Sequence, residues 1–173
     1  MNIAVFCSAY VNDEEYVAPA GRLAWLIGSQ GHSLVWGGSH VGIMKVIADG
    51  VRQHGGKIYG VSVEAYKHRA HKNADEMIIA KDLGERKAAM LAKSDALIVL
   101  PGGLGTLDEL TEVLELKKQA HHNKPVAILN INGFYDGLLA QLTKMHREGF
   151  IPLDISKLVY FANDPDTVMR YLR

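Results

Sequence analysis

Two apolar runs limit the fold of this chain more than any other feature. Residues 96–100 read Ala-Leu-Ile-Val-Leu, and residues 126–130 read Val-Ala-Ile-Leu-Asn. Neither run alternates polar and apolar residues, as a strand with one solvated face would. Short continuous apolar runs of this kind are typical of central strands that helices bury on both faces. The sequence therefore favours a parallel sheet in an α/β protein.

Strand-like and helix-like segments alternate along the rest of the chain. Further strands are expected at residues 3–7, 33–36, 57–62 and 76–80, and helical stretches at about 14–30, 41–53 and 104–119. Strands of about five residues that alternate with helices of about ten to fifteen indicate right-handed βαβ units. We expect a Rossmann-like, doubly wound parallel sheet with helices on both faces, whose ligand lies beyond the carboxyl ends of the strands.

Composition and length narrow the functional class. The 173 residues, 48% of them hydrophobic, are expected to form a single nucleotide-binding domain over residues 1–173. Nineteen basic and nineteen acidic residues leave no net charge, which argues against a nucleic-acid partner and favours a small ligand. The start of the chain lacks a signal peptide, no run reaches the roughly 18 apolar residues of a membrane span, and Cys7 is the lone cysteine. We therefore expect a cytoplasmic protein with no membrane partner.

The strongest motif is Pro-Gly-Gly-Leu-Gly-Thr-Leu-Asp-Glu at residues 101–109, which joins an apolar strand to a helix. Glycines at 102, 103 and 105 let a ligand approach the main chain. The free N–H groups and the positive dipole end of the following helix make this place an anion site, for which phosphate is the natural occupant. Gly102, Gly103, Gly105 and Thr106 are accordingly predicted to bind phosphate, and Thr106 can also cap the helix.

Acidic residues follow the glycines at the start of this helix. Glu109 lies three residues after Thr106, so both side chains share one face and the carboxylate points toward the ligand loop. Acids in a first turn also complement the helix dipole, and that explanation suffices for Asp108 and Glu112. For Glu109 the spacing leaves a catalytic role and a dipole role equally open.

A second glycine cluster follows the second predicted strand. Gly38 and Ser39 there, and Ser8 after the first strand, are predicted to contact the same ligand. The cluster lacks the Gly-x-Gly-x-x-Gly spacing of a dinucleotide site, and neither glycine loop ends in Gly-Lys-Ser/Thr, so NAD binding and a P-loop ATPase are both disfavoured.

Two cations follow the fourth predicted strand. Asp82 and Glu85 have the spacing of a capping box at a helix start. Arg86 and Lys87 then fall in an early helical turn, where the dipole disfavours cations, so at least one of them is expected to serve a ligand.

Other chemistries find little support. The histidines and Cys7 show no metal-ligand spacing, no Gly-x-Ser-x-Gly elbow occurs, and no lysine stands in a recognisable pyridoxal phosphate setting. The basic segment 64–75 is interpreted as a solvated surface loop in preference to a substrate lid.

Arg86-Lys87 together with the pattern Pro-Gly-Gly-x-Gly-Thr-x-x-Glu at 101–109 resembles the LONELY GUY (LOG) family, long mislabelled as lysine decarboxylases. The similarity extends from the first strand through Lys-Pro-Val at 124–126 to Asn-Gly-Phe-Tyr-Asp at 132–136. It implies a homodimer without metal or organic cofactor that hydrolyses a nucleoside 5′-monophosphate, such as a cytokinin riboside monophosphate or AMP, to the free base and ribose 5-phosphate. Arg86 and Glu109 match the family's catalytic pair.

The chain departs from the family pattern on three ligand-facing loops. Ser-Ala-Tyr stands at residues 8–10 where the family has Gly-Ser-Ser, Ser39-His40 replaces Gly-Ser, and Leu83-Gly84 replaces Met-His. These changes concern recognition of the base and ribose. The alternative function is a non-catalytic nucleotide or cofactor carrier on the same fold.

Overall fold

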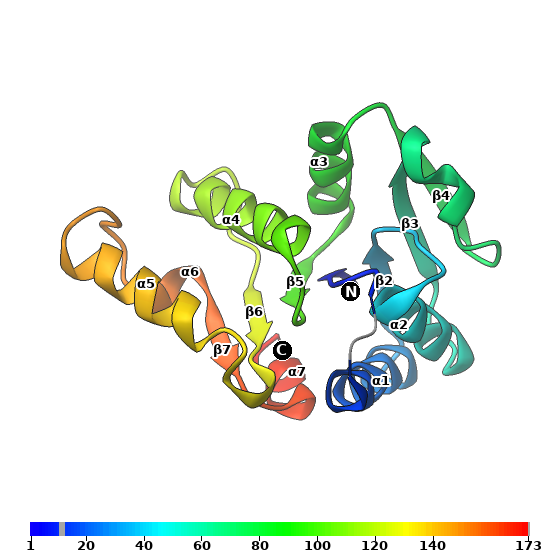
Figure 1. The fold of residues 1–173 in the computed structure, drawn as a ribbon, viewed down its shortest axis with the longest axis horizontal. Coiled ribbons are helices and arrows are strands. Elements are labelled where there is room, and N and C mark those ends of the chain that lie inside the picture. Colours follow the sequence, from blue (N-terminus) through cyan, green and yellow to red (C-terminus); the bar gives the residue numbers. More distant parts are fainter. Residues whose placement is uncertain (11–12, 173) are drawn as a thin grey trace.

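The computed structural model describes residues 1–10 and 13–172. Within these residues, seven strands form one parallel sheet in the order β4-β3-β2-β1-β5-β6-β7 (Figure 1). The strands are β1 (Asn2–Phe6), β2 (Ser33–Trp36), β3 (Ile58–Val63), β4 (Glu76–Ala80), β5 (Ala96–Val99), β6 (Val126–Leu129) and β7 (Tyr160–Ala162). The predicted doubly wound sheet is confirmed, with its change of direction between β1 and β5.

Helices cover both faces of the sheet. They are α1 (Glu14–Ser29), α2 (Gly42–Gln53), α3 (Leu83–Lys93), α4 (Leu104–Lys118), α5 (Asp136–Arg147), α6 (Ile155–Leu158) and α7 (Pro165–Tyr171), with short 3-10 helices η1 (Glu64–Arg69) and η2 (Ile131–Gly133). In Figure 1, α1, α2 and α7 lie below the sheet, and α3 to α6 lie above it. This arrangement divides the buried side chains into two cores.

Strand β1 shows why the central strands are apolar throughout. Ile3 and Val5 belong to the core beneath the sheet, whereas Ala4 and Phe6 belong to the core above it. All four side chains are at most 1% exposed. Since both faces are buried, a polar residue on either face would lose its hydration without a partner.

The carboxyl-terminal part contains elements that we did not predict from sequence. Strand β7 is only three residues long and forms an edge of the sheet, with Tyr160 exposed. Helices α5 to α7 flank it. That residues 1–173 form a single domain stays a prediction.

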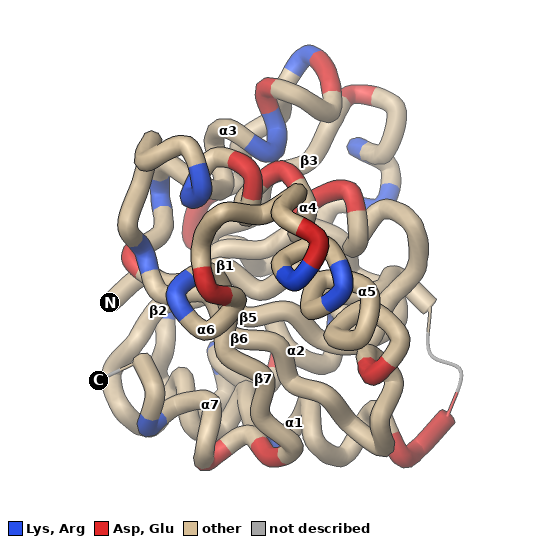
Figure 2. Tube along the Cα trace, turned by 90° about the vertical axis from the view of Figure 1, so that its left-hand side faces the viewer, with Lys and Arg blue, Asp and Glu red and all other residues tan. Residues whose placement is uncertain are grey.

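Charge is distributed evenly over the molecule. Basic and acidic residues are interspersed along the trace (Figure 2). Among the helices of the described residues, none has the length and apolar character that crossing a membrane requires.

Candidate active site

The glycine loop and the start of α4 form one wall of a cavity of about 520 Å³ at the carboxyl edge of the sheet. Helix α4 begins at Leu104, and Gly103 is its N-cap without a side-chain hydrogen bond. The first N–H groups of a helix have no partner within the helix and carry its positive dipole end. Because Gly103, Leu104, Gly105 and Thr106 all line the cavity, this wall has the properties of an anion site.

Glycine stands at each of the three positions of this loop for a different physical reason. A Cβ at Gly102 would overlap the side chain of Thr106, which is 4% exposed, whereas a Cβ at Gly103 or Gly105 would meet open space. None of the three has a positive φ. Gly102 therefore makes room for Thr106, while Gly103 and Gly105 leave the main chain accessible to a ligand.

Arg86 and Glu109 form a buried ion pair in the same cavity. Nη1 of Arg86 donates to Oε1 of Glu109 at 2.6 Å, and the two side chains are 12% and 6% exposed. Oε2 of Glu109 has no hydrogen-bond partner among the described residues. That oxygen is available to water or to a ligand hydroxyl. The structure thus brings together the two residues that the sequence suggested for catalysis.

The surroundings of Glu109 tune its acidity. Burial raises the pKa of this carboxyl, and the neighbouring guanidinium of Arg86 opposes the shift without cancelling it. A carboxyl with a raised pKa holds and releases protons nearer to neutral pH than an exposed one. Glu109 therefore has the acid–base character of a group that can accept or donate a proton.

Three neighbours fix the position of Arg86. The predicted capping box is confirmed in part at the start of α3: Oδ1 of Asp82 accepts from the N–H of Glu85 at 2.8 Å, whereas Oε2 of Glu85 accepts from the N–H of Lys81, one residue before the N-cap, at 2.7 Å. Nε of Arg86 donates to the carbonyl of Val61 in β3 at 2.9 Å. A Cβ at Gly37 would overlap Nη2 of Arg86. Glycine at this position therefore lets the guanidinium pass along the main chain.

The cavity gathers most of the residues predicted from sequence. Gly103, Gly105, Thr106, Arg86, Glu109, Ser8 and Ser39 line it. Gly102 lines an adjoining cavity of about 300 Å³, which shares Ser8 and Gly103 with the first. Gly38 does not line either cavity, and its φ of +76° supplies the turn between Gly37 and Ser39.

Lys87 points away from this site. Its Nζ lies 2.9 Å from Asp108 and 2.5 Å from Glu112, and it is absent from the cavity lining. The pairs with Glu112 and Asp108 raise the pKa of Lys87. Asp108 and Glu112, interpreted from sequence as partners of the helix dipole, thus also hold α3 against α4.

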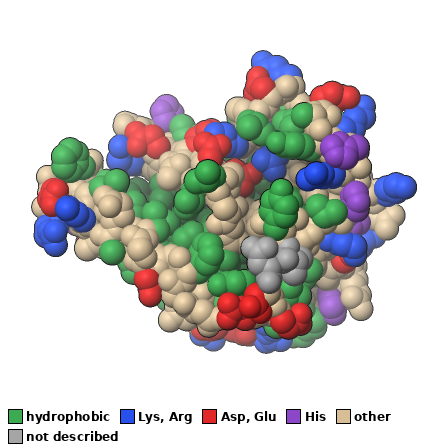
Figure 3. Space-filling view, viewed as in Figure 1, with side chains coloured by type: hydrophobic (Ala, Val, Ile, Leu, Met, Phe, Trp, Pro, Cys, Tyr) green, Lys and Arg blue, Asp and Glu red, His purple; other side chains and the backbone are tan. Residues whose placement is uncertain are grey.

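The interpretation of 64–75 as a solvated loop is wrong in part. Tyr66 and Arg69 of η1 line the cavity opposite the glycine loop, although both are exposed at its rim. Figure 3 shows the recess near the middle of the molecule, bordered by hydrophobic and basic side chains. The position of this segment directly after a strand end was the signal that could have identified it.

Other reactive groups contribute less. Burial raises the pKa of Cys7 far above its usual range, with Glu109 adding to the shift, so this thiol is not a nucleophile. In the part of the chain that the structure describes, no three His, Cys, Asp or Glu side chains are grouped to hold a metal ion.

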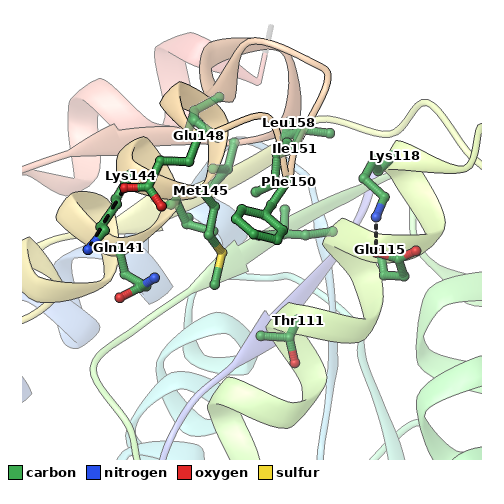
Figure 4. A pocket seen from close by; sticks show the side chains of 14 residues that line it. Thr111, Glu115, Lys118, Gln141, Lys144, Met145, Glu148, Phe150, Ile151 and Leu158 are labelled. Atoms are coloured by element: carbon green, nitrogen blue, oxygen red, sulfur yellow. Dashed lines mark ion pairs between the residues drawn. The ribbon is translucent and has the colours of Figure 1, made fainter.

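A separate apolar groove of about 450 Å³ lies on the far side of α4, between α4, α5 and α6. Met145, Phe150, Ile151 and Leu158 gather in it (Figure 4). Phe150 is 75% exposed. This groove shares no residue with the cavity that Arg86 and Glu109 line.

Known proteins resemble this chain in sequence as well as in fold. A family model described as "Possible lysine decarboxylase" matches residues 44–172. A cytokinin riboside 5′-monophosphate phosphoribohydrolase of Mycobacterium tuberculosis is 37% identical over 169 residues, which cover 96% of this chain and 90% of that protein. The chain belongs to the LOG family. A LOG relative with the same activity in its name, from Arabidopsis thaliana, is 34% identical over 173 residues and covers 98% of this chain and 81% of its own.

Solved structures confirm the fold of this LOG family member. A molybdenum cofactor binding protein of Rippkaea orientalis superimposes with a TM-score of 0.76 at 24% identity, over 98% of this chain and 93% of that one. The molybdenum cofactor carrier protein of Chlamydomonas reinhardtii gives a TM-score of 0.73 at 22% identity, over 99% and 97% of the two chains. At this level of identity the likeness concerns the fold alone.

Proposed function

We propose that this protein hydrolyses the N-glycosidic bond of a nucleoside 5′-monophosphate, either a cytokinin riboside monophosphate or an AMP-like nucleotide, to the free base and ribose 5-phosphate. The observation that carries the proposal is the buried pair of Arg86 and Glu109 within the cavity that the start of α4 lines. The names of the LOG relatives support the same reaction.

The phosphate is bound at the start of α4. Main-chain N–H groups of Gly103 and Gly105 and the hydroxyl of Thr106 approach its oxygens, and the helix dipole favours its charge. Ser8 and Ser39 line the same cavity and contact the sugar or the phosphate. Gly102 and Gly38 shape the two loops, and Lys87 reinforces the site through Asp108 and Glu112.

Glu109 then acts at the anomeric carbon. The bond from ribose C1′ to the base nitrogen breaks, and the bonding electrons leave with the base. The ribosyl cation that develops is stabilised by the carboxylate, which also receives a proton from the water that attacks C1′. The departing base gains a proton, which balances the reaction. Arg86 holds the carboxylate of Glu109 in the position from which it accepts the proton of the attacking water.

A nucleotide carrier on the same fold remains the alternative. A carrier has no use for a carboxylate close to a bound phosphate, because the two negative charges repel each other. Glu109 lines the cavity with one oxygen that has no partner among the described residues, as a hydrolase requires.

The test is a panel of AMP, N6-prenyl-AMP and the matching unphosphorylated nucleosides, with free base measured by chromatography. We expect base release from the monophosphates and little from the nucleosides. Equal turnover of AMP and adenosine contradicts the phosphate site. Stoichiometric binding of the nucleotides with no base release supports the carrier.

The proposal includes a cytoplasmic homodimer. The free thiol of Cys7 suits a reducing compartment. A second copy of the chain would bury the exposed Phe150 and the apolar groove beside α4. Sedimentation velocity should give a dimer for the native protein and a monomer for Phe150→Ser, whereas a native monomer contradicts this part of the proposal.

A further inference from the structure

The positive groups that line the cavity do not balance the charge of a phosphate monoester. In the described structure, the cationic side chains that line it are Arg86 and Arg69. Arg86 is engaged by Glu109 and by the carbonyl of Val61, so its charge is already balanced. A phosphate monoester carries about −1.5 to −2 charges at neutral pH, and a helix N-terminus offers only about +0.5. The start of α4 alone therefore leaves most of that charge unmatched.

Arg69 has a side chain free to supply the missing charge. Its guanidinium makes no hydrogen bond or ion pair with the described residues, although it stands at the cavity rim. Its neighbour Lys67, by contrast, pairs with Glu64 at 3.4 Å and does not line the cavity. An arginine fork can bind two phosphate oxygens at once.

The main chain of Arg69 is held in place while its side chain is free. The carbonyl of Arg69 accepts from the N–H of His40 at 2.9 Å and lies 2.7 Å from His40 Nδ1. The N–H of His71 donates to the carbonyl of Gly38 at 2.8 Å. Nε2 of His71, whose side chain is 6% exposed, lies 2.8 Å from Asp49. These contacts fasten the end of η1 to the loop that carries Ser39, so Arg69 faces the cavity from a fixed point.

We infer that Arg69 is a phosphate-binding residue, which closes over the 5′-phosphate from η1 while the start of α4 holds it from the opposite wall. The inference rests on the proposed function for its ligand, because it assigns Arg69 to the phosphate of that substrate and product. It also separates two tasks between the arginines: Arg86 orients Glu109, and Arg69 neutralises the phosphate.

The test is calorimetric binding of ribose 5-phosphate to the native protein, Arg69→Ala, Arg69→Lys and the control Lys67→Ala. We expect Arg69→Ala to weaken binding about 10- to 100-fold, the usual range for losing a charge-assisted hydrogen bond. Arg69→Lys should recover part of the loss, because lysine keeps the charge without the fork. Lys67→Ala, which removes the same charge from the same segment, should bind like the native protein.

Several results would overturn the inference. Arg69→Ala could bind ribose 5-phosphate with native affinity, Lys67→Ala could lose as much affinity as Arg69→Ala, or the native protein could fail to bind ribose 5-phosphate. If Arg69→Ala loses affinity for adenine but not for ribose 5-phosphate, the inference is also overturned, and Arg69 contacts the base. Because this assay measures binding of a product, a native protein that releases no base would refute the proposed hydrolysis and leave the binding result intact.

Discussion

Gly37→Ala should disable the enzyme without removing any charged or polar group. An added Cβ would lie 2.9 Å from Cε of Met44 and closer still to Nη2 of Arg86, where 3.4 to 4 Å is ordinary contact. Met44 can adjust its flexible side chain. Arg86 cannot move without stretching its hydrogen bonds to Val61 and Glu109. The strain therefore falls on the proposed catalytic pair.

The size of the effect follows from the displacement. To restore ordinary contact the guanidinium must shift by about 1 Å, and a misplacement of that size can cost about a hundred-fold in rate. This loss corresponds to about 2.7 kcal/mol of barrier. We expect kcat for AMP to fall by about that factor, while KM changes only a few-fold because the phosphate wall at α4 is untouched.

Three measurements make the test sharp. Thermal unfolding should show that Gly37→Ala is folded. Gly21→Ala, in α1 with nothing within 4 Å of the added Cβ, should retain the native rate. In a Glu109→Gln background, Gly37→Ala should cost little more, because both changes act on one pair. A folded Gly37→Ala that turns over AMP at the native rate would refute the reasoning.

Further predictions concern Glu109 directly. Glu109→Gln should lower turnover about a hundred-fold or more with little loss of nucleotide affinity, the usual worth of a positioned acid or base. Asp108→Asn removes the same charge one residue away and leaves Lys87 its pair with Glu112, so its turnover should stay within a few-fold of the native rate. If both variants lose turnover equally, Glu109 serves only the helix dipole. Because burial raises the pKa of Glu109 and the base form is the deprotonated one, kcat/KM should rise with pH through a value above the ordinary carboxyl range. A profile flat down to about pH 4 would contradict this assignment.

The sequence predicted the central part of the fold well. Six strands appear where apolar runs stood, because buried central strands leave a clear pattern. Strand β7 was missed, since it has only three residues at a sheet edge, of which Ala162 alone is buried, and so short a strand carries almost no periodic signal. Helix α4 was expected from the glycine loop that begins it, whereas α5 to α7 had no comparable motif.

The candidate site was predicted in its chemistry more than in its geometry. Arg86 and Glu109 were both chosen from sequence, yet only the fold shows that they are hydrogen-bonded across α3 and α4. Arg69 was interpreted as surface charge, because the charge of an isolated loop does not reveal which wall of a cavity it joins. Gly37 was interpreted only as part of the second glycine cluster, and its packing against Arg86 could not be predicted because Arg86 is distant in the chain.

The order of the proposed site residues along the chain has a consequence for how such a protein can diversify. Arg86 and Glu109 are 23 positions apart, and the stretch between them contains α3, β5 and the glycine loop. The proposed catalytic pair therefore lies within one contiguous unit of the chain, whereas Ser8, Ser39 and Arg69 come from loops after the first three strands. Substitutions at Ser8, Ser39 and Arg69 can change which nucleotide is accepted and leave the sequence of that unit unaltered, whereas Gly37, in the second of these loops, must stay small because Arg86 packs against it.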